Sequence, residues 1–328
     1  MRRGLARWLA CVALTMAAIN AAAGSIEGEP ITPIRPAETD AAKTDLGRKL
    51  FNDVRLSKGN SVACVSCHRL DKGGDDDRSS PLGMDGRPLD FNSPTIFNAA
   101  LNYRLSWRGN FRTLEEQNEF VLLDRRLMST TWEELLPKLR ADQDYARTFT
   151  ALYGSRPART PVLDALATFQ RSLLTPNARF DRYLKGQNDA MTSEEQRGYQ
   201  LFKSYGCTAC HQGMNLGGNL LQRFGVFYDP FTGRGRVTDA DLGRFAITAS
   251  ENDRHVFRVP SLRNVAVTGP YLHDGSALSL PEAVDIMGRA QLGRDLPGQD
   301  IDLIVKFLGT LTGEYQGRSL SEIDRSTR

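Results

Sequence analysis

Two short motifs in the sequence each combine two thiols with an imidazole. They are Cys64-Val-Ser-Cys67-His68 and Cys207-Thr-Ala-Cys210-His211. A c-type haem needs this combination, because its two vinyl groups form thioethers with the thiols and the imidazole binds the iron. Paired cysteines also occur in disulfides, thioredoxin-like redox sites and zinc sites. The histidine directly after each second cysteine favours haem over these three alternatives, so we expect two covalently bound haem c groups.

The remaining cysteine, Cys11, lies in an N-terminal segment with the pattern of an export signal. Three arginines lie at its start, and an apolar run without acidic residues ends in Ala21-Ala22-Ala23, which a signal peptidase can cleave. The run is short and alanine-rich for a membrane anchor, which is the alternative. We expect residues 1–23 to be a signal peptide that is removed and the mature chain to be periplasmic.

The charge of the chain does not favour nucleic-acid binding. The full sequence has 42 Lys and Arg residues against 39 Asp and Glu residues. Residues 1–23 carry three arginines and no acid, so their removal leaves 39 basic residues against 39 acidic ones. Four haem propionates would then make the protein acidic, and no basic block of the kind that binds nucleic acid stands out.

The segments that must position the motifs mostly have helical periodicity. Apolar residues recur at helical spacing in four segments, which are residues 131–140, 142–152, 161–174 and 303–311. Thr160 is the expected cap before Pro161 in the first turn of the third segment. Thr192–Glu195 and Ser279–Glu282 fit the capping box, in which hydroxyl and acid each satisfy a free N–H group.

Two long loops and a short repeat also bear on the predicted fold. Residues 71–95 and 213–243 are rich in Gly, Pro and Asp, and loops of this length are usually functional. The pattern Gly-x-x-Leu-Phe precedes both motifs, at Gly47–Phe51 and Gly198–Phe202, which suggests two related domains. We therefore predict a mainly α protein with two cytochrome c-like haem domains and long haem-wrapping loops. The predicted domains are residues 24–176 and 177–328.

The iron ligands follow in part from the residue types. His68 and His211 are the expected proximal ligands, and only His255 and His273 remain as further histidines. Methionine is the other common axial ligand, and it raises the reduction potential of the haem. Met287 lies in the segment that begins at Ser279, well after the second motif, where cytochromes c usually place such a ligand. A methionine buried in the core is the alternative.

With these motifs, the chain resembles the bacterial di-haem cytochrome c peroxidase family, which includes the MauG-type protein-modifying enzymes. The resemblance covers about residues 40–313. It is carried by the segments Asp45–Phe51, Arg55–Ser57, Asn92–Thr95, Leu174–Asn177, Asn215–Gly218, Val256–Asn264 and Gly269–Gly275. The last two segments are the most specific.

The resemblance implies a role for each haem. The haem on His68 would be a low-potential peroxidatic haem, and the haem on His211 a high-potential electron-entry haem with Met287 as its second ligand. The MauG branch has tyrosine at this last position, so Met287 resembles the peroxidase branch. Trp107 matches a tryptophan between the two haems that could mediate electron transfer, with packing at the domain interface as its alternative role.

The resemblance also implies a calcium ion between the two halves. Asn92, through its side chain, and Thr268 and Pro270, through their carbonyl oxygens, match the positions of the ligands. All three offer oxygen donors, as a hard cation requires.

Two positions depart from the family. A histidine that leaves the iron on activation is replaced in Leu82-Gly83-Met84, and the family's catalytic glutamate is replaced by Leu127, before Met128. An aliphatic side chain cannot move the protons of peroxide. Glu119 and Asp124 are alternative sources of a carboxylate. Met84 is either a spectator in its loop or a permanent ligand of the first haem, which would then have no open face.

These observations leave three functions. The first is a peroxidase that reduces hydrogen peroxide to water with electrons from a small periplasmic cytochrome c or cupredoxin. The second is a non-enzymatic electron-transfer or redox-sensing cytochrome, in which both irons are saturated. The third is a MauG-like oxidase of a partner protein, which Met287 and Leu127 both weaken. The resemblance also implies a homodimer.

Overall fold

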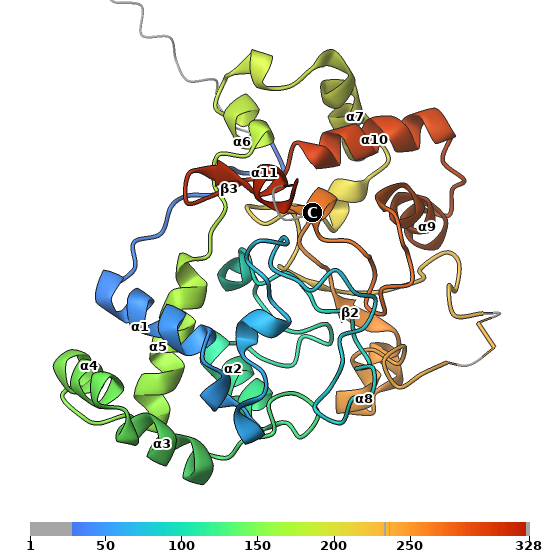
Figure 1. The fold of residues 1–328 in the computed structure, drawn as a ribbon. Coiled ribbons are helices and arrows are strands. Elements are labelled where there is room, and N and C mark those ends of the chain that lie inside the picture. Colours follow the sequence, from blue (N-terminus) through green and yellow to red (C-terminus); the bar gives the residue numbers. More distant parts are fainter. Residues whose placement is uncertain (1–27, 233, 236, 326–328) are drawn as a thin grey trace, which may run out of the picture.

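The computed structural model describes residues 28–232, 234–235 and 237–325, and these residues form a mainly helical molecule (Figure 1). The α-helices of the described residues are α1 (Ala41–Phe51), α2 (Leu114–Leu123), α3 (Trp132–Ala141), α4 (Gln143–Tyr153), α5 (Arg159–Ser172), α6 (Arg179–Leu184), α7 (Ser193–Ser204), α8 (Phe245–Thr248), α9 (Leu280–Leu292), α10 (Gly298–Gly309) and α11 (Leu320–Arg325). Residues 71–95 form neither helix nor strand, as expected of a long loop.

The strands are short and pair antiparallel. The strand β1 (Leu221–Arg223) pairs with β2 (Val256–Arg258), with Leu221 opposite Arg258. The other pair is β3 (Glu314–Tyr315) and β4 (Arg318–Ser319). Residues 213–243 contain only β1 among their described residues, so this segment too is mostly loop.

Three of the predicted helix starts are confirmed by their hydrogen bonds. The Thr131 hydroxyl accepts from the backbone N–H of Glu134, and the Asp142 carboxylate caps α4. At α7 the Thr192 hydroxyl and the Glu195 carboxylate accept from each other's backbone N–H, which is the complete capping box. These starts were predictable because a cap depends on residues within one helical turn.

One predicted cap was wrong, and one predicted capping box is only half formed. The helix α5 begins at Arg159 with Ala158 as its N-cap residue, so the prediction of Thr160 as the cap was wrong. Pro161 then lies in the first turn, where the missing N–H costs no helical hydrogen bond. At α9 the Ser279 hydroxyl accepts from Glu282, but the Glu282 carboxylate accepts from the N–H of Leu278 rather than that of Ser279.

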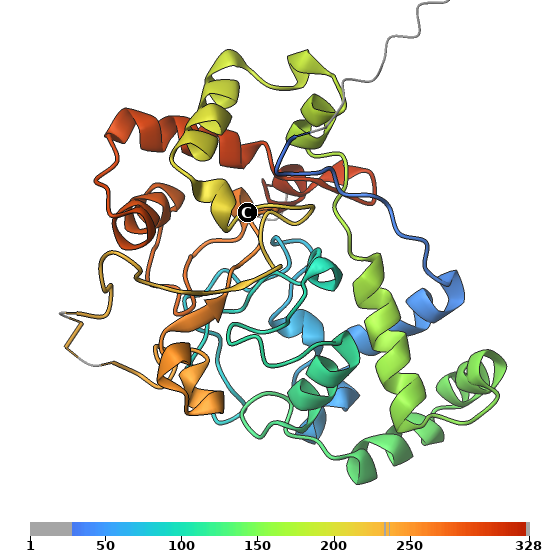
Figure 2. The ribbon, with the colours of Figure 1, turned by 180° about the vertical axis from the view of Figure 1, so that it is seen from behind.

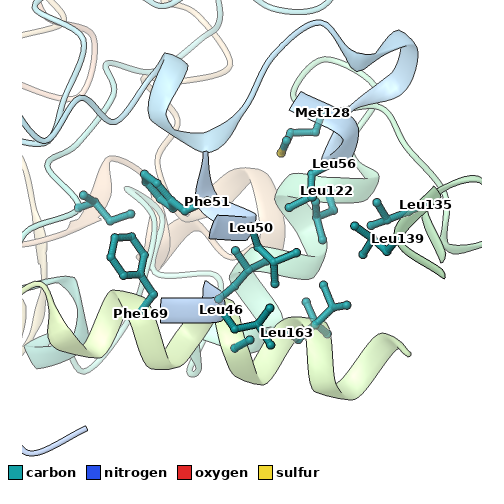
Figure 3. Packing of buried hydrophobic residues seen from close by; sticks show 14 of the residues in the cluster. Leu46, Leu50, Phe51, Leu56, Leu122, Met128, Leu135, Leu139, Leu163 and Phe169 are labelled. Atoms are coloured by element: carbon teal, nitrogen blue, oxygen red, sulfur yellow. The ribbon is translucent and has the colours of Figure 1, made fainter. Parts of the chain in front are cut away.

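The buried apolar residues form two main cores, one around each half of the chain. In the first core, Leu46 and Phe51 of α1 face Leu163 and Phe169 of α5, as Figure 3 shows. The same core takes in Leu122, Met128, Leu135 and Leu139. The second core joins α6, α7 and α10 through residues that include Phe180, Tyr199, Phe202, Ile304 and Phe307.

The Gly-x-x-Leu-Phe repeat marks an equivalent helix crossing in each half. A Cβ atom on Gly47 of α1 would lie 2.0 Å from the carbonyl oxygen of Ala165 in α5. A Cβ atom on Gly198 of α7 would lie 2.0 Å from the carbonyl oxygen of Leu303 in α10. The helices α7 and α10 cross in contact with each other, and they lie together in both views of the molecule (Figure 1 and Figure 2). Glycine therefore allows the helix before each haem motif to contact the backbone of a later helix.

Replacing Gly198 with alanine is expected to destabilise the protein by roughly 1–3 kcal/mol, because the added methyl group meets backbone that cannot move aside. Urea unfolding of the purified protein measures this as a lower midpoint at unchanged slope. The matched control is Gly309→Ala in α10, since a Cβ atom there meets nothing within 4 Å. Equal midpoints for the two variants would contradict this account of the crossing.

The two ends of the chain cross over between the predicted domains. The switch from the first core to the second falls between Leu173 and Phe180, close to the predicted boundary after residue 176. However, Ile31 is buried in the second core and Leu320 in the first. The N–H of Gly213 also donates to the carbonyl oxygen of Pro30 at 2.8 Å, which ties the N-terminal segment to the second half.

The predicted signal peptide, residues 1–23, lies outside the described residues. Within the described part of the chain, no helix combines the length and the apolar character that crossing a membrane requires.

Candidate functional site

The two histidines of the motifs are held in the same way. The Nδ1 atom of His68 lies 3.2 Å from the carbonyl oxygen of Gly74, and that of His211 lies 3.1 Å from the carbonyl oxygen of Leu216. Because a carbonyl oxygen only accepts, Nδ1 carries the proton in both rings and Nε2 keeps its lone pair. An N–H···O=C bond of this kind orients a histidine that binds a metal through its other nitrogen.

Burial keeps both imidazoles neutral. It lowers the pKa of His68 below the usual range and lowers the pKa of His211 to about 4. Burial is the largest cause in both cases, since it penalises the charged imidazolium. A neutral imidazole is the form that binds iron, so both histidines fit the role of proximal ligand.

The cysteines of the motifs do not fit the alternatives to haem. None of the four motif cysteines is in a disulfide. Burial raises the pKa of the Cys64 thiol to about 12 and that of Cys207 to about 11, whereas a reactive redox pair needs a lowered thiol pKa. Within the described ranges, His, Cys, Asp or Glu ligand atoms converge in threes only at Asp241, His273 and Asp274, which lie outside both motifs.

A cavity of about 470 Å³ opens beside the second motif. Cys207, Cys210 and His211 line it, and so does Met287 from α9. Most of the remaining wall is apolar, with contributions that include Phe202, Leu262, Val265, Leu280, Ile304 and Leu308. The volume and the apolar lining suit a large planar cofactor, and two thiols, an imidazole and a thioether border the same space.

The other two histidines are both bonded to Asp241, although His273 also lines the cavity. The Nε2 atom of His273 lies 2.8 Å from a carboxylate oxygen of Asp241, and Nδ1 of His255 lies 2.6 Å from the Asp241 carbonyl oxygen. The His255 ring also stacks on Phe231. Arg234 pairs with the carboxylates of both Asp241 and Asp274, so this cluster already holds its own cation. Met287 therefore remains the better candidate for a second axial ligand in the cavity.

Trp107 lies where the two halves of the chain meet. It is 9% exposed, and its Nε1 atom donates to the carbonyl oxygen of Asn92 at 2.9 Å. It belongs to a third apolar cluster with Phe257, and Met287 packs against this cluster. Trp107 also lines the cavity of the second motif. The structure thus brings together two residues, Trp107 and Met287, that are 180 positions apart in the sequence.

The three candidate calcium ligands line the same cavity. Asn92 comes from the loop after the first motif, and Thr268 and Pro270 come from the second half. The Nδ2 atom of Asn92 donates to the carbonyl oxygen of Arg78 at 2.8 Å, which fixes the amide and leaves its Oδ1 atom as the acceptor. The donor set is oxygen only, as a hard cation requires.

The two positions that depart from the family lie next to each other in space. The backbone N–H of Met84 donates to the carbonyl oxygen of Arg126 at 2.9 Å, and Arg126 directly precedes Leu127. The Arg126 side chain donates to Asp90 and to the carbonyl oxygen of Pro88, so it holds the loop that carries Met84. The Met84 sulfur lies 3.7 Å from the hydroxyl of Ser61, three residues before Cys64.

The two alternative carboxylates are occupied. Glu119 uses both oxygens to bind Arg159, and one of them also accepts from the indole N–H of Trp132. The Arg159 guanidinium lowers the pKa of Glu119, so it is ionised and held on α2. Asp124 caps the turn before Leu127 by accepting from the backbone N–H groups of Arg126 and Leu127. These bonds weigh against either acid as a replacement for the family's glutamate.

Sequence reasoning did not single out Arg258, which the structure places among the site residues. It is 5% exposed, lines the cavity, and its backbone N–H donates to the carbonyl oxygen of Trp107 at 2.8 Å. The available signal was an arginine inside the apolar run Val256-Phe-Arg-Val259, since an arginine is rarely buried without a partner.

Comparison with known proteins gives consistent matches over most of the chain. Residues 41–189 match the family described as di-haem cytochrome c peroxidase. The chain is 37% identical to the cytochrome c peroxidase Ccp of Escherichia coli, over 96% of this chain and 68% of that protein. It is also 37% identical to the cytochrome c551 peroxidase of Nitrosomonas europaea, over 92% and 90%. A crystal structure of a MauG-like protein associated with microbial copper homeostasis matches with a TM-score of 0.77 at 29% identity, over 86% of this chain and 93% of that one.

Proposed function

Because the chain belongs to the bacterial di-haem cytochrome c peroxidase and MauG family, we propose that it reduces hydrogen peroxide to water with electrons from a small redox protein. The observation that carries the proposal is that Met287 borders one cavity with Cys207, Cys210 and His211. A methionine there is the ligand expected of the peroxidase branch. Each peroxide takes up two electrons and two protons and gives two waters, so the protein must deliver both.

The residues divide this work between the two halves, residues 24–176 and 177–328. When bound, the two haems supply the electron storage and the iron site at which peroxide is cleaved. His68 would hold one haem, and His211 and Met287 would hold the other and keep its potential high. Trp107 occupies the space between the halves and offers an aromatic path for electrons.

The proposed location, electron donor and calcium site rest on the same residues and on the family resemblance. Haem c and the N-terminal pattern support a periplasmic protein, with a small cytochrome c or cupredoxin as its electron donor. Asn92, Thr268 and Pro270 would hold a calcium ion, and that ion would tie the two halves together. A homodimer is part of the proposal on the family resemblance alone. Met287 and Leu127 argue against a MauG-like oxidase.

A second function, a non-enzymatic electron-transfer cytochrome, is favoured by one specific observation. The half-buried Met84 and Leu127 occupy adjacent places where the family has its histidine and glutamate, and no free carboxylate replaces the latter among the candidates. If the thioether of Met84 binds the first haem iron, that iron has no position left for peroxide.

Optical and EPR spectra of the half-reduced holoprotein, before and after peroxide is added, distinguish the two functions. The peroxidase is expected to show a high-spin first haem that peroxide converts, with steady turnover when a reduced donor is supplied. Two low-spin irons in every redox state, together with no reaction toward peroxide, would establish the electron-transfer cytochrome instead.

Replacing Met84 with alanine tests its role directly. If Met84 is a spectator, as the peroxidase requires, the variant keeps the spectrum and the peroxide rate of the wild type within about a factor of two. The backbone N–H of residue 84 still donates to Arg126, so the loop should keep its place. A low-spin wild type that becomes high-spin and gains peroxide binding on this change would identify Met84 as the blocking ligand. Leu82→Ala in the same loop is the control, since Leu82 is exposed.

A further inference from the structure

The strand β2 carries a buried arginine that has no acidic partner. Arg258 is 5% exposed, and its Nε atom donates to the carbonyl oxygen of Ser106 at 3.1 Å. No carboxylate of the described residues forms an ion pair with its guanidinium. Burial lowers its pKa to about 10, so it stays charged at neutral pH. Arg263 is also buried and lies five residues after Arg258, but its guanidinium pairs with the Asp181 carboxylate at 2.7 Å.

Among the described residues, the cavity beside Arg258 is also lined by no acidic side chain that could balance the charge of the arginine. Arg258 is the only lysine or arginine among the described residues that line it. Taking an unpaired charge out of water costs several kcal/mol, so a buried arginine normally has an anionic partner. A molecule that fills the cavity and carries a negative group would supply the missing charge.

The position of Arg258 indicates which part of that molecule it meets. The thioethers fix one edge of a c-type haem at its cysteines, and the two propionates project from another edge of the ring. Cys207 packs against the second core. Arg258 instead lies beside Ser106 and Trp107, at the part of the cavity that faces the first half of the chain. The planar guanidinium matches the fork of a carboxylate.

We propose that Arg258 binds a propionate of the haem attached to Cys207 and Cys210, and that it thereby raises the reduction potential of this haem. The inference rests on the proposed haem at the second motif. A positive charge in a buried site stabilises the reduced iron, which has one positive charge less than the oxidised iron. The backbone N–H of Arg258 also donates to the carbonyl oxygen of Trp107, so the same residue holds the backbone of the tryptophan.

Potentiometric titration and resonance Raman spectroscopy of the holoprotein test the proposal. In Arg258→Gln, the equilibrium constant for electron uptake by the second haem is expected to fall at least tenfold, which is about 59 mV for one electron. The propionate bending modes should shift as well. Arg258→Lys should keep the potential near the wild-type value, because it keeps the charge. Arg223→Gln, an exposed arginine on the paired strand β1, is the matched control and should change neither readout.

An unchanged potential and unchanged propionate modes in Arg258→Gln, with both haems attached, would overturn the proposal. If that variant does not fold, Arg258→Lys decides the matter, because a lysine replaces the two-pronged contact by a single point charge. Shifted propionate modes in Arg258→Lys would support the contact, and unchanged modes would overturn it. The mass of the wild-type chain reports haem attachment independently. A haem missing from Cys207 would therefore refute the proposed function. An attached haem whose potential and propionate modes do not depend on Arg258 would refute only the present proposal.

Discussion

A glutamate in place of Leu127 is expected to raise kcat/KM for hydrogen peroxide by about 10²-fold or more, because a positioned general acid–base typically contributes 10²–10⁴-fold. The reduction consumes two protons, and an aliphatic side chain can transfer neither. The backbone at this position is already held, since the N–H of Leu127 donates to Asp124 and that of Met128 donates to Val121. A glutamate side chain at position 127 would therefore extend from the same backbone position as that of Leu127.

Steady-state kinetics against peroxide measure the effect, and Leu127→Gln is the control. Glutamine has nearly the size and polarity of glutamate but no titratable proton. The Leu127→Glu variant should gain a pH dependence that Leu127→Gln lacks. Equal rates and equal pH profiles for the two variants would show that residue 127 does not face the reacting peroxide.

Replacement of Met287 by histidine is expected to lower the potential of the second haem by a few tenths of a volt. Axial ligands move haem potentials over a range of ~0.8 V, and methionine lies toward the high end. Met287 reaches the cavity from α9, where Gly288 follows it, and packs against the cluster of Trp107. Electron entry from a donor of high potential would then become unfavourable.

Redox titration followed by optical spectroscopy measures this potential, and the loss of the methionine–iron charge-transfer band reports the ligand change itself. Met191→Leu is the matched control, because Met191 is a buried methionine of the second core that does not line the cavity. A potential that does not move in Met287→His would place the second ligand elsewhere and would remove the main support for the peroxidase proposal.

The features that depend on neighbouring residues were predictable from the sequence. The two haem motifs, the helical periodicity from residues 131 and 142 onward and the capping box at Thr192 each involve residues that are close in the sequence. Thr160 was misplaced because proline is tolerated at several positions of a first turn, so Pro161 alone does not determine where α5 begins.

The features that depend on distant residues were not predictable in the same way. The repeat at Gly47 and Gly198 was visible as a repeat, but only the close helix crossings explain why both positions are glycine. Arg258 meets Trp107 across 151 positions of sequence, and no local pattern signals that contact. The ion pair between Glu119 and Arg159 is likewise a tertiary contact. The sequence alone therefore allowed Glu119 as a replacement for the family's catalytic glutamate, and the structure disfavours it.

The crossing of the chain ends constrains the order in which the molecule can assemble. Ile31 precedes the whole second half in the chain but belongs to its core, whereas Leu320 follows the whole first half and belongs to the core of that half. The first half therefore cannot complete its core until the segment around Leu320 has been made, whereas the second half finds Ile31 already present. The first core, against which Cys64 packs, should therefore stay open until that segment arrives, which would give the attachment machinery time to act on Cys64 in a loosely folded chain.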